Sequence, residues 1–285
     1  MKAFRSLGVE DAAIAIEYQA PDQVVRSYRS SRVIARQQRS GNIKQRYGAE
    51  FLSMHRADLL DIFTGDLPSE SVHLDADCVD TETRGDVAVA RFADGGEIEA
   101  DIVIGADGIH SAVRDSLLGP IEPTFTGCIC WRGMAPIDAV SHMSDALDMT
   151  AWWGPHGHVV HYPVRRGDLV NFVAHFDSDG WTGESWNHEC DRSELMDTYG
   201  EWNESLLRLI KSSDRYYKWA LFDRDPRPAR FAAPRQANPP GVARRAAETR
   251  YRHEAARPLR QGQIAEPGRL ALRLRLVGGR RLFDA

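Results

Sequence analysis

The sequence predicts an α/β fold, in which helical segments flank a long series of strands. Between residues 71 and 176, apolar and polar residues alternate repeatedly and are separated by Gly-containing turns, a pattern typical of strands. Residues 1–20 and 191–213 instead have the apolar spacing of helices. With 285 residues, 42% of them hydrophobic and 27% charged, the chain is long enough for one large domain or two ordinary ones.

Each element follows from its local pattern. After the helical start, residues 23–37 predict one or two short strands, and a helix begins at about Arg56. A DGG turn joins two strands, 86–92 and 97–106, into a hairpin. Four more strands are expected at 128–137, 149–155, 158–167 and 169–176. The last helix has Asp191 or Ser193 as N-cap and an apolar side formed by Leu206, Leu207, Leu209 and Ile210.

The stretch ADIVIGADGIHSAVRDSL, residues 100–117, predicts a buried strand that ends in glycines and leads into a helix. Glycine allows the backbone to approach a ligand closely, and a helix N-terminus attracts phosphate. Asp107 could accept hydrogen bonds from ribose hydroxyls. A corner between strand and helix, with Asp107 acting only as a cap, explains the spacing equally well.

The same stretch resembles the Asp-Gly motif of the FAD-dependent aromatic hydroxylases, which are single-component flavoprotein monooxygenases. The resemblance implies flavin and pyridine-nucleotide contacts at Asp107, Gly108, Ser111 and Arg114. HRADLLDIF resembles the family's His-Arg stretch, whose arginine, here Arg56, reaches the flavin. We add Cys78 to the expected cofactor-binding residues. WRGMAPI, WWGPHGHVVHYPVRRGDLVNFVAHF and YKWALFDRDP are similar to the salicylate hydroxylase and hydroxybenzoate hydroxylase branch.

The resemblance implies an incomplete FAD/NAD(P)-binding flavoprotein-hydroxylase fold with a β-sheet substrate domain. We expect an incomplete FAD-binding domain over 1–127, a substrate domain over 128–224 and an aberrant tail over 225–285. The implied activity is FAD- and NADH- or NADPH-dependent hydroxylation of a small aromatic acid, such as salicylate or hydroxybenzoate, by dioxygen. No nucleic acid or membrane partner is expected, the location is expected to be cytoplasmic, and a homodimer is left open.

GHVVHYPV predicts a strand that places His158, Val160 and Tyr162 on one face and His161 on the other. In the similar hydroxybenzoate hydroxylases, a histidine four residues before a tyrosine takes a proton from the substrate's hydroxyl group; these positions match His158 and Tyr162. Two alternatives remain: a structural sheet histidine, or a metal site formed by His156, His158 and His161. We expect no metal site, because the strand faces disagree and the four cysteines form no C-x-x-C pair.

Two of the family's flavin motifs have no match in the sequence, G-x-G-x-x-G and a late Gly-Asp motif. Gly167-Asp168 instead predicts a turn. From residue 226 onward the chain has 14 Arg, no Lys, 4 acidic residues and seven Pro, and we expect an out-of-frame tail rather than a nucleic-acid-binding arm. We therefore expect a chain that is truncated at both ends and binds FAD poorly. A flavin-free, non-catalytic remnant and a nicotinamide dehydrogenase are the alternative functions.

Overall fold

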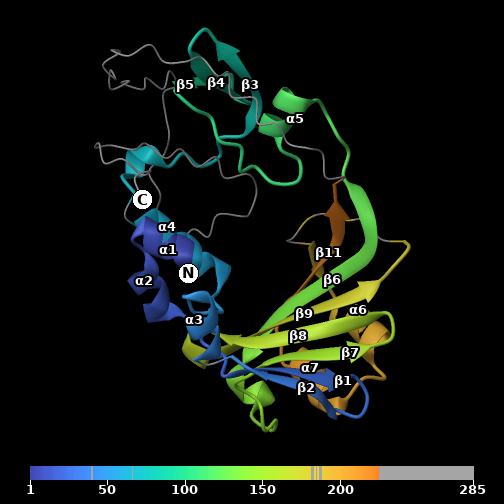
Figure 1. Ribbon diagram of the computed structural model, residues 1–285. Helices are drawn as coiled ribbons and strands as arrows, with labels where there is room; N and C mark the ends of the chain where they lie inside the picture. The colour runs from blue at the N-terminus through green and yellow to red at the C-terminus, as the bar shows by residue number, and fades with distance from the viewer. Residues whose placement is uncertain (40, 66, 181–182, 184, 186–187, 225–285) are drawn as a thin grey trace. The chain divides into compact units, whose positions relative to one another are not determined.

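The computed structural model describes residues 1–224 except 40, 66, 181–182, 184 and 186–187 (Figure 1). The predictions for the tail, 225–285, lie outside the described residues. By contacts the described residues divide into two compact units, one within 1–66 and 125–222 and one of Leu67–Thr124 with Asp223 and Arg224. The division into a cofactor domain and a substrate domain stays a prediction.

An eight-stranded sheet dominates the first unit, in the order β10-β11-β6-β9-β8-β7-β1-β2 (Figure 1). The pairs β6–β9, β9–β8 and β8–β7 are antiparallel, as is the pair β1–β2. The pair β1–β7 is parallel. All strands predicted within 23–37 and 128–176 are confirmed. The strands are β1 (Asp22–Ser27), β2 (Val33–Gln38), β6 (Thr124–Pro136), β7 (Met149–Gly154), β8 (Gly157–Val164), β9 (Leu169–Asp177), β10 (His188–Cys190) and β11 (Tyr216–Asp223).

Two helices, α6 (Arg192–Tyr199) and α7 (Glu204–Lys211), supply the apolar side chains that pack on one face of this sheet. A single helical run was expected, but it is interrupted before Asn203, whose side-chain oxygen accepts a hydrogen bond from the Ser205 amide at 3.0 Å and starts α7. The predicted apolar side is confirmed. Asp191 occupies the N-cap position of α6, but its side chain makes no capping hydrogen bond. The buried core includes Trp131, Trp152, Phe172, Leu195, Tyr199, Leu206, Leu209 and Ile210.

The remaining helices of this unit lie in its N-terminal part. The expected N-terminal helix is split into α1 (Lys2–Leu7) and α2 (Glu10–Ile16), because Gly8 adopts a φ of 77° and ends α1. They are followed by α3 (Asn42–Tyr47) and α4 (Arg56–Gly65), and the start of α4 at Arg56 is confirmed. Two short 3-10 turns, η2 (Ile137–Val140) and η3 (Arg165–Gly167), also belong to this unit. The position of η3 confirms the turn predicted at Gly167.

The second unit contains a three-stranded antiparallel sheet of β3 (Cys78–Arg84), β4 (Val87–Phe92) and β5 (Glu97–Ala100). The 3-10 turn η1 (Ser69–Ser71) precedes the sheet and helix α5 (Ala112–Leu118) follows it. The hairpin predicted between β4 and β5 is confirmed. No helix in the described part of the chain is long and apolar enough to span a membrane.

The buried strand predicted up to Gly105 is wrong, because β5 ends at Ala100. Ile102 and Ile104 are 73% and 78% exposed. The register explains the early end: Ala100 pairs with Ala88, one residue after the start of β4, so the partner strand ends there. Without a partner, the backbone N–H and C=O groups beyond Ala100 cannot continue the ladder.

Candidate active site and cofactor-binding residues

The N-terminus of α5 is built by two of the predicted cofactor residues. Ser111 is its N-cap, since its hydroxyl oxygen accepts a hydrogen bond from the Arg114 amide at 3.0 Å. The same hydroxyl donates to Asp107 at 2.5 Å, and the Val113 amide donates to the other Asp107 oxygen at 3.2 Å. Gly108 has a φ of 85°, a left-handed conformation that favours glycine. Ser111 and Asp107 thus both accept hydrogen bonds from amides at the start of α5, which is the capping role that the sequence left open.

The Asp107 carboxylate is ionised at neutral pH. Burial raises its pKa, but the hydrogen bonds from Ser111 and from the backbone amides outweigh burial and lower the pKa overall. A carboxylate has more acceptor sites than these donors occupy, so it can still accept hydrogen bonds from hydroxyl groups of a ligand. The Arg114 guanidinium binds Asp115 and the Ile109 carbonyl oxygen within the same unit. A cofactor role for Asp107 and Arg114 stays a prediction.

Cys78 lies beside this helix. A surface hollow of about 440 Å³ is lined by Cys78, Val79, Asp80, His110, Ala112, Asp115 and Ser116. The Cys78 thiol donates to the Asp80 carbonyl oxygen at 3.6 Å, and burial raises its pKa, so it stays protonated at neutral pH. The structure therefore brings Cys78, Asp107, Gly108, Ser111 and Arg114 into one region of the second unit.

Replacing Ser111 by alanine is expected to destabilise the second unit by about 0.5–2 kcal/mol, because α5 loses its N-cap hydrogen bond. Urea unfolding followed by circular dichroism measures this change. Ser111→Thr keeps the hydroxyl and is the matched control. Equal stability of the alanine and threonine variants would contradict the capping role.

The sheet of the first unit carries a polar face, opposite to the face that α6 and α7 cover. Val159 and His161 belong to the covered side, with 0% exposure each, whereas His158 and Tyr162 alternate with them and lie on the polar face. This alternation confirms the face prediction. Across the strands, His158 pairs with His175 and Tyr162 with Asn171. We define the polar face by Cys130, Arg132, His158, Tyr162, Asn171 and His175.

His158 is a half-buried, neutral base. Burial lowers its pKa, so the imidazole carries no charge at neutral pH and can accept a proton. Its ring stacks on that of His175, with centroids 4.4 Å apart and an angle of 11° between the planes. Burial also raises the pKa of Tyr162, which shares a hydrogen bond with Asn171, so the phenol remains a proton donor. A base and a hydroxyl donor thus lie along one strand.

Arg132 is a functional candidate that the sequence analysis missed. Its guanidinium lies over the rings of Tyr217 and Trp219, 5.1 and 5.8 Å from their centroids. Burial lowers its pKa, and the charge of Arg56 lowers it further. In the sequence, Arg132 lies within WRGMAPI, one of the segments that are similar to the hydroxylase branch. Strand alternation was the available signal, because it places Arg132 on the same face as Cys130.

Arg56 is the first residue of α4 and its side chain is exposed. Nearby, Arg165 binds Asp58 through two hydrogen bonds of 2.9 and 3.1 Å. No hydrogen bond or ion pair of Arg56 occurs among residues 1–224 as described. Together with Arg132, Arg56 therefore makes this part of the first unit suitable for an anion.

A metal site formed by His156, His158 and His161 was one of the alternatives predicted from the sequence. The structure separates these residues: His161 lies on the covered face, and the exposed His156 lies 3.6 Å from an Asp177 carboxylate oxygen. A different group, formed by Cys128, Cys130 and His175, was not predicted from the sequence. Cysteines two residues apart on one strand were the only signal for it, since the histidine comes from another strand.

Comparisons with known proteins identify aromatic monooxygenases as relatives of this chain. No protein-family model matches the chain. A 3-amino-4-hydroxybenzoate 2-monooxygenase from Streptomyces platensis is 37% identical over 200 residues, which cover 70% of this chain and 50% of that protein. A 6-hydroxynicotinate 3-monooxygenase from Pseudomonas fluorescens is 31% identical over 231 residues, which cover 80% of this chain and 60% of that protein.

The chain belongs to the FAD-dependent aromatic hydroxylases. It spans 50–60% of the length of these two relatives. Two solved structures share the fold. A salicylate hydroxylase in a substrate complex has a TM-score of 0.66 at 24% identity, over 80% of this chain and 60% of that one. A single-substitution variant of HpxO from Klebsiella pneumoniae, solved with FAD, has a TM-score of 0.70 at 23% identity, over 78% of this chain and 57% of that one.

Proposed function

We propose that this chain acts as an FAD- and NAD(P)H-dependent monooxygenase that hydroxylates a small aromatic acid, such as hydroxybenzoate or salicylate. One observation carries the proposal: the neutral base His158 and the hydroxyl donor Tyr162 share the polar face with the cation Arg132. An aromatic acid with a ring hydroxyl can use all three: the base for its hydroxyl proton, the hydroxyl donor for a hydrogen bond and the cation for its carboxylate. The relatives support the substrate class, since their names describe monooxygenases of hydroxylated aromatic acids.

His158 would take the proton of the substrate's hydroxyl group. Deprotonation makes the ring carbon beside the oxygen richer in electrons and easier to hydroxylate, and a base with a pKa near the working pH is suited to this transfer. Tyr162 would hold the ring by hydrogen bonding. Arg132 would pair with the substrate's carboxylate, because a guanidinium binds a carboxylate through two parallel hydrogen bonds.

The predicted cofactor residues fit a nucleotide with phosphate and ribose groups. Arg56 offers an exposed guanidinium to anionic oxygens, and Asp107 offers an ionised carboxylate to hydroxyl groups. Gly108, Ser111 and Arg114 shape the turn around Asp107, and Cys78 lies beside it. Bound FAD, reduced by NAD(P)H, would activate dioxygen, so that one oxygen atom is transferred to the ring and the other leaves as water. The proposal includes a cytoplasmic location, where NAD(P)H is available, and a homodimer.

Replacing Arg56 by alanine is expected to weaken FAD binding roughly 10-fold or more, because a hydrogen bond to a charged group contributes about 1.5–3 kcal/mol. Titration of the purified chain with FAD, followed by quenching of flavin fluorescence, measures the dissociation constant. Arg46→Ala removes an exposed cation of the same unit and is the control. An unchanged dissociation constant in Arg56→Ala would contradict the assignment.

The proposed function is tested by supplying the chain with FAD, NADH or NADPH, and a series of hydroxylated benzoates. A substrate that accelerates NAD(P)H oxidation and gives a hydroxylated product supports the proposal. NAD(P)H oxidation without oxygen uptake would indicate a dehydrogenase instead. A chain that neither binds FAD nor consumes NAD(P)H would support the flavin-free alternative.

A further inference from the structure

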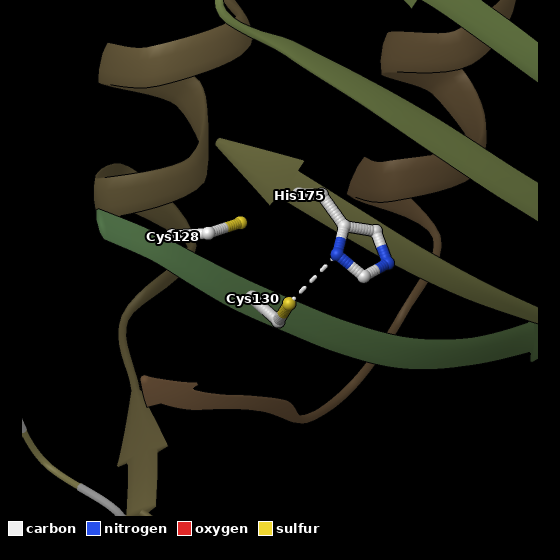
Figure 2. A group of neighbouring side chains, drawn as sticks. All are labelled: Cys128, Cys130 and His175. Atoms are coloured by element: carbon white, nitrogen blue, oxygen red, sulfur yellow. Dashed lines mark hydrogen bonds between the residues drawn. The ribbon is translucent and has the colours of Figure 1, made fainter. Parts of the chain in front are cut away.

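Cys128, Cys130 and His175 bring three metal-ligating atoms together at one end of the sheet (Figure 2). The two cysteines are two residues apart on β6, so both side chains project from the same face of the strand. His175 is the direct partner of Cys130 on β9. The Cys130 sulfur and the His175 Nδ1 atom are 2.9 Å apart, and all three ligand atoms lie within 4.8 Å of one another.

The Cys130 sulfur and the His175 Nδ1 atom share a hydrogen bond, and the imidazole tautomer decides which of them donates. In the tautomer with an unprotonated Nδ1, the lone pair of this nitrogen points at the sulfur. A cation that replaces the thiol proton would use the same lone pair.

The spacing suits a tetrahedral cation. Zinc binds thiolate at about 2.3 Å and imidazole at about 2.0–2.1 Å, so neighbouring ligand atoms of a tetrahedral site lie about 3.5–3.8 Å apart. The present distances reach that range with shifts of about 1 Å, which small side-chain rotations supply. Two sulfur ligands and one imidazole select soft or borderline cations over Mg²⁺ and Ca²⁺.

The surroundings hold His175 in place. The Tyr199 hydroxyl donates to the His175 carbonyl oxygen at 2.8 Å, and the His158 ring is stacked nearly parallel to the His175 ring. Because imidazole lone pairs lie in the ring plane, the stacked His158 does not point its nitrogen atoms at the same cation. Three protein ligands therefore leave a fourth position for water or another small ligand.

We propose that Cys128, Cys130 and His175 form a binding site for a thiophilic divalent cation, such as Zn²⁺, with one open coordination position. The proposal departs from the expectation that the chain has no metal site. It is argued from these three side chains alone and does not rest on the proposed hydroxylase activity, although His175 stacks on His158. Binding joins one Zn²⁺ to two sulfur atoms and one nitrogen and releases the two thiol protons to solvent, with no change in oxidation state. Affinity therefore rises with pH.

The test uses the full chain, stripped of metal with a chelator and kept reduced. Zn²⁺ is titrated in competition with a chromophoric chelator, and Co²⁺ is used as a spectroscopic probe. We expect one Zn²⁺ per chain with a dissociation constant below about 1 μM. We also expect thiolate-to-cobalt charge-transfer absorption and the release of two protons per ion in weakly buffered solution.

The variants Cys130→Ser and His175→Gln are expected to weaken Zn²⁺ binding at least about 100-fold, since loss of even an outer partner of a ligand costs 10–100-fold. Cys190→Ser, which alters a half-buried thiol outside the group, should bind like the unchanged chain. If the buried Cys130→Ser variant fails to fold, as judged by circular dichroism, the half-buried Cys128→Ser decides. No binding by the unchanged chain, or binding that survives both cysteine substitutions, would overturn the proposal.

Discussion

Replacing His158 by alanine is expected to lower the rate of hydroxylation about 10²–10⁴-fold while the affinity for FAD stays unchanged. This range is typical of the loss of a general base. The physical reason is that His158 is neutral, half-buried and on the same strand face as Tyr162, where it can accept the substrate's hydroxyl proton. Product formation under saturating FAD, NAD(P)H and aromatic acid measures the rate, and flavin titration measures the affinity.

The pH dependence gives a second readout of the same residue. Burial lowers the pKa of His158, so its basic form persists below the ordinary histidine value of 6.5. The acidic limb of the unchanged enzyme's profile should therefore lie below that value and be absent from His158→Ala. His156→Asn changes an exposed histidine in the preceding turn, keeps its left-handed backbone accessible and should leave the profile unchanged. A parallel loss of FAD affinity in His158→Ala would assign the residue a structural role.

Replacing His161 by phenylalanine is expected to remove about 2–3 kcal/mol of the stability loss that the chain undergoes between pH 7 and pH 4.5. His161 is fully buried on the covered face, and burial lowers its pKa to about 4. Its folded-state pKa lies below the unfolded value of 6.5. The residue therefore contributes stability above pH 6.5, and this contribution is lost as the pH falls toward 4. Each unit of pKa shift corresponds to about 1.4 kcal/mol.

Phenylalanine suits this test because it keeps a planar ring in the core. Neither His161 nitrogen has a hydrogen-bond partner within the described residues, so the substitution removes no bond found there. Urea unfolding of both proteins at pH 7 and at pH 4.5 gives the four free energies, and their double difference isolates His161 from other titrating groups. An identical pH dependence in both proteins would show that the buried ring does not resist protonation.

Local patterns were sufficient for most strands and for the faces of β8. The alternation in GHVVHYPV separates His158 from His161, because strand geometry fixes this separation once the segment is known to be extended. The start of α4 at Arg56 and the hairpin between β4 and β5 likewise follow from short-range rules. Each of these features depends on a few residues that are close together in the sequence.

Features that depend on a distant partner were not predictable from local patterns. DIVIGADG has the composition of a buried strand, yet residues 101–106 form no strand because β4 offers no further partner beyond Ala88. The group of Cys128, Cys130 and His175 depends on the register between β6 and β9, which no local pattern in either segment reveals. Asp107 was recognised as important, but only the structure shows that both its oxygens are hydrogen-bonded at the start of α5.

The proposed activity transfers one oxygen atom from dioxygen to a small aromatic acid. To measure this transfer, the chain is incubated with FAD, NAD(P)H and a hydroxylated benzoate under isotopically labelled dioxygen, and the product is analysed by mass spectrometry. We expect a product with one labelled oxygen atom on the ring and an unlabelled carboxylate. NAD(P)H oxidation that yields only hydrogen peroxide across the substrate series, or a product whose new oxygen comes from water, would contradict the proposed activity.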